Sequence, residues 1–297
     1  MDLVSIGWLV LFAILGLCFG SFFNVVILRS LSGESIVFPG SKCPKCGKPL
    51  KPWHNIPVLS YVLLRGKCAF CSEKISIQYP IVELLTMIIF VYSYLKFDLT
   101  IKTMFAIIIA SCLLIMSATD LKEKLVDCRI AIGLAVVALL YKGLLNHQWI
   151  DCILGLVVGA VLLEVVARLG YLFVKDRAFG EADTYVAGAL GACFGLSGLL
   201  PVLLYTLIVP MVYILPVFLY KQYKKGNQLT CVLFLSFILA TIVYKFYFMN
   251  PVVFALMLAF GILSAMQILR TLKQEPNPMY LPLVPAFTLG ALYYLYF

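Results

Sequence analysis

The sequence predicts an all-α polytopic membrane protein, a bundle of about eight to ten transmembrane helices with one small polar insert. Of the 297 residues, 63% are apolar and only 12% are charged, whereas a soluble domain usually carries about 25% charged residues. The apolar residues also form runs of about 16 to 25, the length that a helix needs to cross a bilayer core of about 30 Å.

The apolar runs place the predicted helices along the chain. The first run is too long for the apolar part of a cleaved signal peptide, has no basic segment before it and is followed by Arg29. We therefore predict a retained membrane span. Several later runs are short or meet at a proline, which leaves the number of spans open. The predicted spans are 4–28, 80–95, 101–119, 129–145, 150–174, 184–199, 200–220, 229–248, 251–270 and 281–297.

Lysines and arginines predict the orientation. If the segment after the first span is cytoplasmic and the spans alternate, all but four of the 23 basic residues fall in cytoplasmic connections. The net charge of +9 is therefore a topology signal. We expect no nucleic-acid partner, because the charge is spread over several connections with no nucleic-acid-binding fold. The four exceptions are Lys96, Lys102, Lys142 and Lys245.

Residues 30–79 form a long hydrophilic segment with two C-x2-C pairs. The pairs, Cys43/Cys46 and Cys68/Cys71, are separated by 21 residues, a spacing typical of four-thiolate zinc sites. Two disulfides are the alternative, but they require an oxidising compartment, and the charge distribution places this segment in the reducing cytoplasm. We predict a structural Zn²⁺ site, because protein ligands fill all four positions.

Other residues of metal-binding types have simpler interpretations. Gly47 directly follows the first pair, where a turning chain often needs a positive φ. His54 could bind metal, but four thiolates already complete a site. His147 lies in a short outer connection. The other cysteines lie in or beside spans and are expected to be small apolar packing residues; they are Cys18, Cys112, Cys128, Cys152, Cys193 and Cys231.

Acidic residues are scarce, 14 in all, and ionisable groups in or near a span mark function by default. Asp120 ends the third span and Asp183 opens the sixth, both at the predicted cytoplasmic face. Two carboxylates at one depth suit an aspartyl protease, in which the ionised partner activates water and the protonated partner protonates the leaving group. Two alternatives stay open, Asp183 as a helix N-cap and Asp120 as an ordinary helix-end charge.

The two aspartates are predicted to differ in role. We expect Asp183 in the first turn of its helix, where free N–H groups favour a carboxylate, and Asp120 in the last turn of its own, where free carbonyls disfavour one. Asp183 would then activate water and Asp120 would donate the proton. The neighbouring Lys122 and Lys124 act on Asp120 in the opposite direction.

The other acids near the spans are weaker candidates. Asp127 and Glu181 lie close in sequence to the predicted pair, while Glu83 and Glu164 lie inside spans and are expected to be interhelical hydrogen-bond partners. The chain has no G-x-S-x-G, Walker-type or G-x-G-x-x-G segment, so serine hydrolase, nucleotide hydrolase and Rossmann functions have no support.

Four segments carry a resemblance to the type IV prepilin peptidase family, and the match runs over residues 1–225 and returns near 281–290. The second of them is long and highly specific. The segments are Gly16–Arg29 (G-L-C-F-G-S-F-F-N-V-V-I-L-R); the insert from its first cysteine pair to Thr86; Thr119-Asp120-Leu121; and Gly180-Glu181-Ala182-Asp183 followed by Gly188–Gly195. Ala182 replaces the second glycine of the family's G-x-G-D, and Tyr185 stands where a lysine is usual, but both aspartates are in place.

The resemblance implies a membrane aspartyl endopeptidase of the bacterial cytoplasmic (inner) membrane. Members remove the short basic leader from type IV prepilins and pseudopilins at the cytoplasmic face, and many then methylate the new N-terminus with S-adenosylmethionine. Pilus assembly, type II secretion and DNA uptake all stay open as settings. Carried over to this chain, the catalytic pair is Asp120 and Asp183, and the metal ligands are Cys43, Cys46, Cys68 and Cys71.

The resemblance also divides the chain. We expect a first transmembrane helix over 1–29, a cytoplasmic zinc-binding insert over 30–79, the protease core over 80–225 and C-terminal helices over 226–297. Within the last part, 226–274 is expected to be a pair of spans that the usual member lacks.

Two other functions are weighed beside the bifunctional enzyme. One is a peptidase without methyltransferase activity. The other is a proton-coupled carrier that uses Asp120 and Asp183 as a relay. A relay would place acids at the bilayer midplane, whereas these two are predicted at one face, so we favour the protease.

Overall fold

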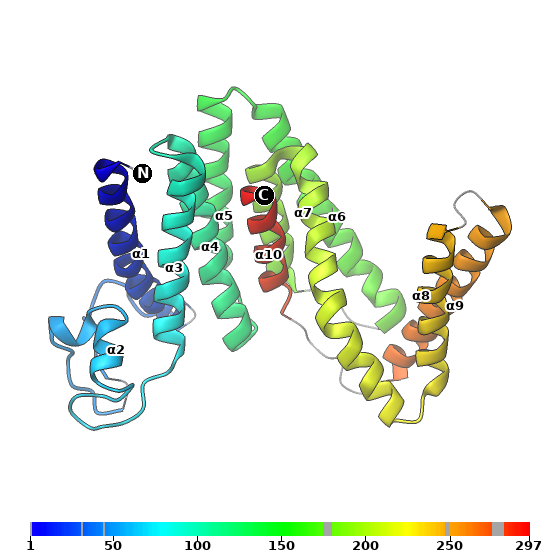
Figure 1. The fold of residues 1–297 in the computed structure, drawn as a ribbon, viewed down its shortest axis with the longest axis horizontal. Coiled ribbons are helices and arrows are strands. Elements are labelled where there is room, and N and C mark those ends of the chain that lie inside the picture. Colours follow the sequence, from blue (N-terminus) through cyan, green and yellow to red (C-terminus); the bar gives the residue numbers. More distant parts are fainter. Residues whose placement is uncertain (1, 31, 44, 175–179, 247–249, 275–281) are drawn as a thin grey trace. The chain divides into compact units, whose positions relative to one another are not determined.

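The computed structural model describes residues 2–30, 32–43, 45–174, 180–246, 250–274 and 282–297. Within these ranges the long elements are all helices (Figure 1). A short 3-10 helix, η1 (Pro52–Asn55), precedes α2, and a π-helical segment, η2 (Leu139–Leu145), continues α5. The α-helices are α1 (Leu3–Arg29), α2 (Leu59–Leu63), α3 (Gln78–Phe97), α4 (Ile101–Glu123), α5 (Cys128–Ala138), α6 (Trp149–Val174), α7 (Glu181–Lys224), α8 (Gln228–Phe246), α9 (Pro251–Gln274) and α10 (Val284–Tyr296).

The predicted all-α membrane bundle is confirmed. Among the described residues, six helical segments are long and apolar enough to cross a membrane. Two more apolar stretches, Gln228–Val243 and Pro251–Ser264, are shorter. The last predicted span, 281–297, corresponds to α10, which has 13 residues and is therefore too short to cross a core of about 30 Å as a straight helix.

The chain divides into two compact units. The first comprises Met1–Leu162, Glu181–Thr206 and Pro282–Phe297. The second comprises Leu163–Gly180 and Leu207–Leu281. All the predicted site residues belong to the first unit.

In the first unit, α1 and α3 approach each other closely at two glycines. A Cβ atom added at Gly16 would lie 2.6 Å from the Cα of Met87, and one added at Gly20 would lie 2.6 Å from the Cα of Glu83. Any side chain at either position would push the helices apart. The glycines are four residues apart, so they lie on one face of α1 and form the small-xxx-small contact typical of membrane helices.

A second close contact joins α6 to the first part of α7. A Cβ atom on Gly191 would overlap the carbonyl of Gly155, and one on Gly159 would overlap the carbonyl of Ala187. The order of these contacts shows that the two helices run antiparallel.

α7 is interrupted at Gly195. This residue has φ 75° and ψ 178°, and an added Cβ would overlap the carboxylate of Asp151. Only glycine avoids both the strain of a positive φ and the overlap with Asp151. The sequence predicted a boundary five or six residues later, near Pro201, but the backbone breaks where glycine allows a positive φ.

α10 links α4 to the second part of α7 (Figure 1). Its Thr288 hydroxyl lies 2.5 Å from the hydroxyl of Ser117 and donates to the carbonyl of Leu113 at 3.2 Å. On the other side, a Cβ on Gly290 would lie 2.7 Å from the hydroxyl oxygen of Thr206. The short C-terminal helix therefore supplies polar contacts inside an apolar bundle.

In the second unit, α8 and α9 pack on each other. Gly261 of α9 faces the ring of Phe237, since an added Cβ would lie 3.1 Å from the ring. The thiol of Cys231 donates to the carbonyl of Leu219 at 3.4 Å and ties α8 to the end of α7. This helix pair occupies the segment 226–274 that the sequence predicts as an extra pair.

The contact between α6 and α7 yields a stability test. We expect Gly191→Ala to lower the free energy of unfolding by about 1–3 kcal/mol, the usual cost of overpacking, seen as a lower melting temperature in detergent. The matched control is Gly133→Ala in α5, where an added Cβ meets nothing within 4 Å. Equal melting temperatures for the two variants would contradict the close backbone contact.

Candidate active site and metal centre

Each cysteine pair of the insert lies in a tight turn with the same hydrogen bonds. The N–H of the first cysteine donates to the carbonyl five residues later, over 3.0 Å from Cys43 and 2.8 Å from Cys68. The N–H of the residue four positions on, Gly47 or Ser72, donates back to the carbonyl of that cysteine at 2.9 Å. Both residues have positive φ, 69° and 59°, so the φ predicted for Gly47 is confirmed.

The two turns bring the four sulfurs together, as the spacing predicts. The sulfur atoms of Cys43, Cys46, Cys68 and Cys71 all lie within 4.8 Å of one another, and those of Cys43 and Cys71 are 3.9 Å apart. A tetrahedron with metal–sulfur bonds of about 2.3 Å has sulfur–sulfur edges of about 3.8 Å. The cluster therefore has the size and the donor atoms of a four-thiolate metal site.

The surroundings of the cluster favour metal binding over disulfides. All four cysteines are free. The backbone N–H of Phe70 donates to the sulfur of Cys68 at 3.5 Å and helps to lower the pKa of that thiol to about 7, whereas burial and the neighbouring thiols raise the pKa of Cys71 to about 11. The crowding of four thiols without a disulfide is therefore the observation that favours a metal site. His54 is not part of the cluster; its ring contacts Phe70 edge-on, with centroids 5.3 Å apart.

Glu83 attaches the insert to α3. Its carboxylate is 6% exposed and accepts a hydrogen bond of 2.7 Å from the N–H of Val58. Val58 has φ 60°, a rare and strained conformation for a β-branched residue. The interhelical hydrogen bond predicted for Glu83 is made with the side chain of Ser21 in α1. The bond to Val58 is additional and forms because the insert folds back onto the start of α3.

Asp120 lies in the last turn of α4, as predicted, and is 4% exposed. Its carboxylate accepts the N–H of Val284 at 3.1 Å. Val284 is the first residue of α10, so this carboxylate also lies at the N-terminus of another helix. That environment favours a negative charge.

Asp183 lies in the first turn of α7, as predicted, and is 8% exposed. It stands 12 residues before Gly195, which is about 18 Å along a helix. The Val284 that binds Asp120 stands ten residues before Tyr294, about 15 Å along α10. Tyr294 contacts Phe194, directly before Gly195. Gly195 lies at Asp151, near the start of α6, and Asp151 is beside Lys142, at the far end of η2 from Asp120. Both aspartates therefore lie toward the opposite end of the first unit from this contact.

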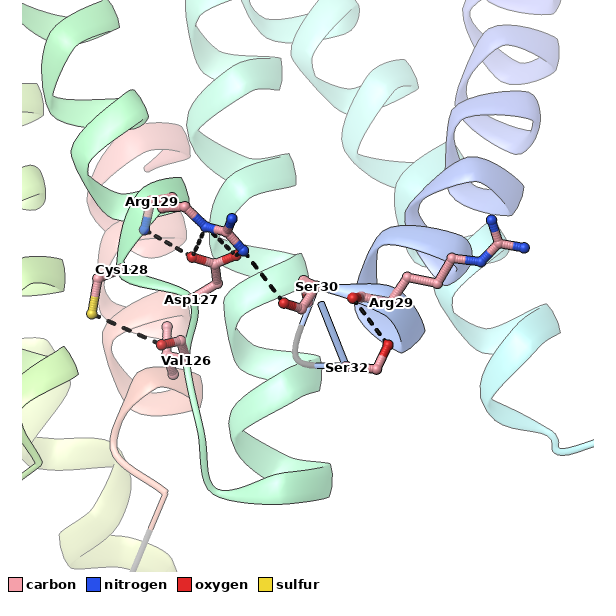
Figure 2. A network of polar contacts seen from close by, with 7 residues as sticks. All are labelled: Arg29, Ser30, Ser32, Val126, Asp127, Cys128 and Arg129. Carbon is pink, nitrogen blue, oxygen red and sulfur yellow. Dashed lines mark hydrogen bonds and ion pairs between the residues drawn. The ribbon is translucent and has the colours of Figure 1, made fainter. Parts of the chain in front are cut away.

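Asp127 is occupied in a structural contact. It caps α5, accepting the backbone N–H of Arg129 at 2.9 Å and pairing with its guanidinium at 2.8 Å. The hydrogen bond from that side chain lowers the pKa of Asp127. Arg129 also reaches the carbonyl of Ser30 at 3.5 Å and joins the start of α5 to the end of α1 (Figure 2). A carboxylate held ionised in this way is a poor candidate for sharing a proton.

Two polar contacts had no signal in the sequence. One is the hydrogen bond between Asp120 and Val284, which are 164 residues apart. The other is Asp151, which accepts the N–H of Leu196 at 3.0 Å and lies 3.6 Å from the ammonium of Lys142. Glu164 pairs with Arg168 one turn away in the same helix, at 2.7 Å.

These features define a class of protein, a multi-pass membrane protein with two buried aspartates at helix ends and a four-cysteine insert. Comparison with known families agrees. The model of the bacterial peptidase A24 N-terminal domain matches residues 14–97, and that of the type IV leader peptidase family matches residues 107–215. The chain belongs to the type IV leader peptidase family.

Its relatives include three proteins named prepilin leader peptidase/N-methyltransferase. The protein of Myxococcus xanthus is 36% identical over 194 residues, which are 65% of this chain and 58% of that protein. The protein of Neisseria gonorrhoeae is 33% identical over 220 residues, which are 65% of this chain and 76% of that protein. The protein of Xanthomonas campestris is 34% identical over 221 residues, which are 66% of this chain and 76% of that protein. No solved structure matches the chain.

The sulfur cluster yields a metal-content test. We expect the purified protein to hold one zinc ion per chain and Cys46→Ser to lose it, because a structural site needs all four thiolates. Elemental analysis after gel filtration measures this. Cys128→Ser, which removes a thiol outside the cluster, should keep the zinc. Retention of a full equivalent of zinc by Cys46→Ser would contradict the assignment.

Proposed function

We propose that the protein is a membrane-embedded aspartyl endopeptidase that removes the basic leader from type IV prepilins or pseudopilins. Membership of the leader peptidase family and the names of its relatives support this activity. The structural observation that carries the proposal is the pair of buried carboxyls, Asp120 and Asp183, each within one turn of a helix end and both toward one end of the first unit.

The chemistry needs one ionised and one protonated carboxyl. The ionised carboxylate takes a proton from water, whose oxygen attacks the scissile carbonyl carbon, and the other carboxyl gives its proton to the leaving amine. The N–H of Val284 holds one oxygen of Asp120, which orients the group and leaves its second oxygen for the reaction. Because Asp120 and Asp183 each lie at a helix N-terminus, helix dipoles stabilise both carboxylates and do not determine which of the two is the base.

The active site would face the cytoplasm. The distribution of lysines and arginines supports this orientation. The insert lies at the same end of the first unit as the start of α5, since Arg129 bonds the carbonyl of Ser30 at the end of α1. Leader and cleavage site would therefore be reached from the basic, cytoplasmic side.

Zn²⁺ is the metal that the cluster fits best, because four thiolates in a tetrahedron are typical of structural zinc. Cys43, Cys46, Cys68 and Cys71 would hold it and so fix the two turns of the insert. Glu83 then transmits the position of the insert to α3 through Val58.

Methylation of the new N-terminus with S-adenosylmethionine is the second proposed activity. Its support is the N-methyltransferase in the names of the relatives, together with the match of the N-terminal family model to residues 14–97, which contain the insert.

The aspartate pair yields an activity test. We expect Asp120→Asn and Asp183→Asn each to lower leader cleavage at least about 10²-fold, the usual contribution of general acid–base catalysis, while the protein still inserts in the membrane. Cleavage of a purified prepilin is followed by gel shift. The control is Asp98→Asn, an exposed aspartate in the connection between α3 and α4. Normal cleavage by either active-site variant would overturn the proposed dyad.

The methylation proposal is tested on the cleavage product. After incubation of the prepilin with the protein and S-adenosylmethionine, we expect the mature N-terminus to carry one added methyl group in a mass spectrum. A cleaved but unmethylated product would support a peptidase without methyltransferase activity and leave the first proposal standing.

A further inference from the structure

A pocket lies between the second half of α1 and the insert. Its volume is about 370 Å³, within the range of sites that bind small molecules. Cys18, Phe22 and Arg29 line it from α1, and Val37 and Pro39 line it from the insert. No sequence motif predicts this pocket, and the proposed peptidase mechanism does not use it.

The pocket runs along the last three turns of α1. Cys18 and Arg29, both in its wall, are separated by 11 residues of one helix, which is about 16 Å along the axis. The deeper wall is mainly apolar, with Phe22 and Val25 beside the hydroxyl of Ser21. A ligand that fills the whole pocket must therefore have an apolar part and a polar end.

Arg29 defines the polar end. Its guanidinium donates to the carbonyl of Ser35 at 2.8 Å and to that of Gly40 at 3.4 Å, and a guanidinium has five N–H donors. The side chain points away from the ion pair of Asp127 and Arg129 (Figure 2). These two hydrogen bonds fix the guanidinium of Arg29 at the mouth of the pocket, and further N–H groups of the side chain can bind a ligand.

The charge of the insert selects an anion. Residues 30–79 contain seven lysines and arginines but only two glutamates, and no acidic side chain lines the pocket. A cationic ligand would be repelled, whereas clusters of basic residues beside a membrane helix attract anionic lipids.

Exposed apolar residues beside the pocket agree with contact to the membrane surface. Val37 is 67% exposed and Phe38 76% exposed, and both lie in a loop that follows directly on a membrane helix. Trp53, elsewhere in the insert, is 60% exposed. Large apolar side chains interspersed with cations are typical of segments that lie in the bilayer interface.

We propose that this pocket binds an anionic phospholipid, with the phosphate at Arg29 and the start of an acyl chain along Phe22 and Val25. The bound lipid would join α1 to the loop 35–41 and so hold the insert against the membrane.

Photo-crosslinking tests the proposal. The full chain is placed in phosphatidylcholine nanodiscs that contain either a phosphatidylglycerol or a phosphatidylcholine probe, each with a diazirine near the glycerol end of the acyl chain. We expect the anionic probe to label peptides containing residues 18–29 and 36–41 about fivefold more than the neutral one, the effect of one cation beside an anionic lipid. Equal labelling by the two probes would overturn the proposal.

Variants separate charge from shape. Arg29→Gln should abolish the preference for the anionic probe, whereas Arg29→Lys, which keeps the cation, should retain most of it. Lys74→Gln removes one charge from the insert outside the pocket and should leave the preference unchanged. Zinc content checks that each variant keeps its folded insert. Loss of the preference in Arg29→Lys or Lys74→Gln would contradict a site built on the charge of Arg29, and so would displacement of the probe by S-adenosylmethionine.

Discussion

Close contact between helices at small residues is the constraint on which the rest of the first unit depends. Lipid tails are as apolar as the helices, so burial from water does not drive helices together, and van der Waals contact must do so. Gly16 and Gly20 let α1 touch α3, and Gly155 and Gly191 let α6 touch α7. Each contact needs the absence of a side chain at a particular place, and each fixes the depth of one helix against its neighbour.

Fixed helix depths decide which polar groups meet. In an apolar interior a carboxylate or hydroxyl without a partner is costly, and several buried polar groups of the first unit have one. Asp120 meets the first N–H of α10, Thr288 meets Ser117, and Glu83 meets Val58. The contact at Asp120 relates to the proposed function, because it holds a carboxyl of the proposed catalytic pair in one orientation without taking up both oxygens.

In the insert, a local sequence pattern forms the cysteine turns, and tertiary contacts then attach them to the helices. The C-x2-C spacing makes two similar turns, and the turns converge on one cluster of sulfurs. The two turns alone would not fix the orientation of the insert relative to α1 and α3, to which its ends are connected. The strained backbone at Val58, bound by Glu83, and the carbonyls held by Arg29 place it against the ends of α3 and α1.

The sequence by itself determined the membrane class, the first five helical spans, the cysteine cluster and the position of both aspartates within one turn of a helix end. Composition, run length and ligand spacing are local properties, and these features need nothing else. Only the tertiary structure decided the partner of Asp120, the break at Gly195, the role of Asp151 and the pocket beside Arg29. Those features join residues far apart in the chain. They depend on how far each helix is shifted along its neighbour, which no local sequence pattern specifies.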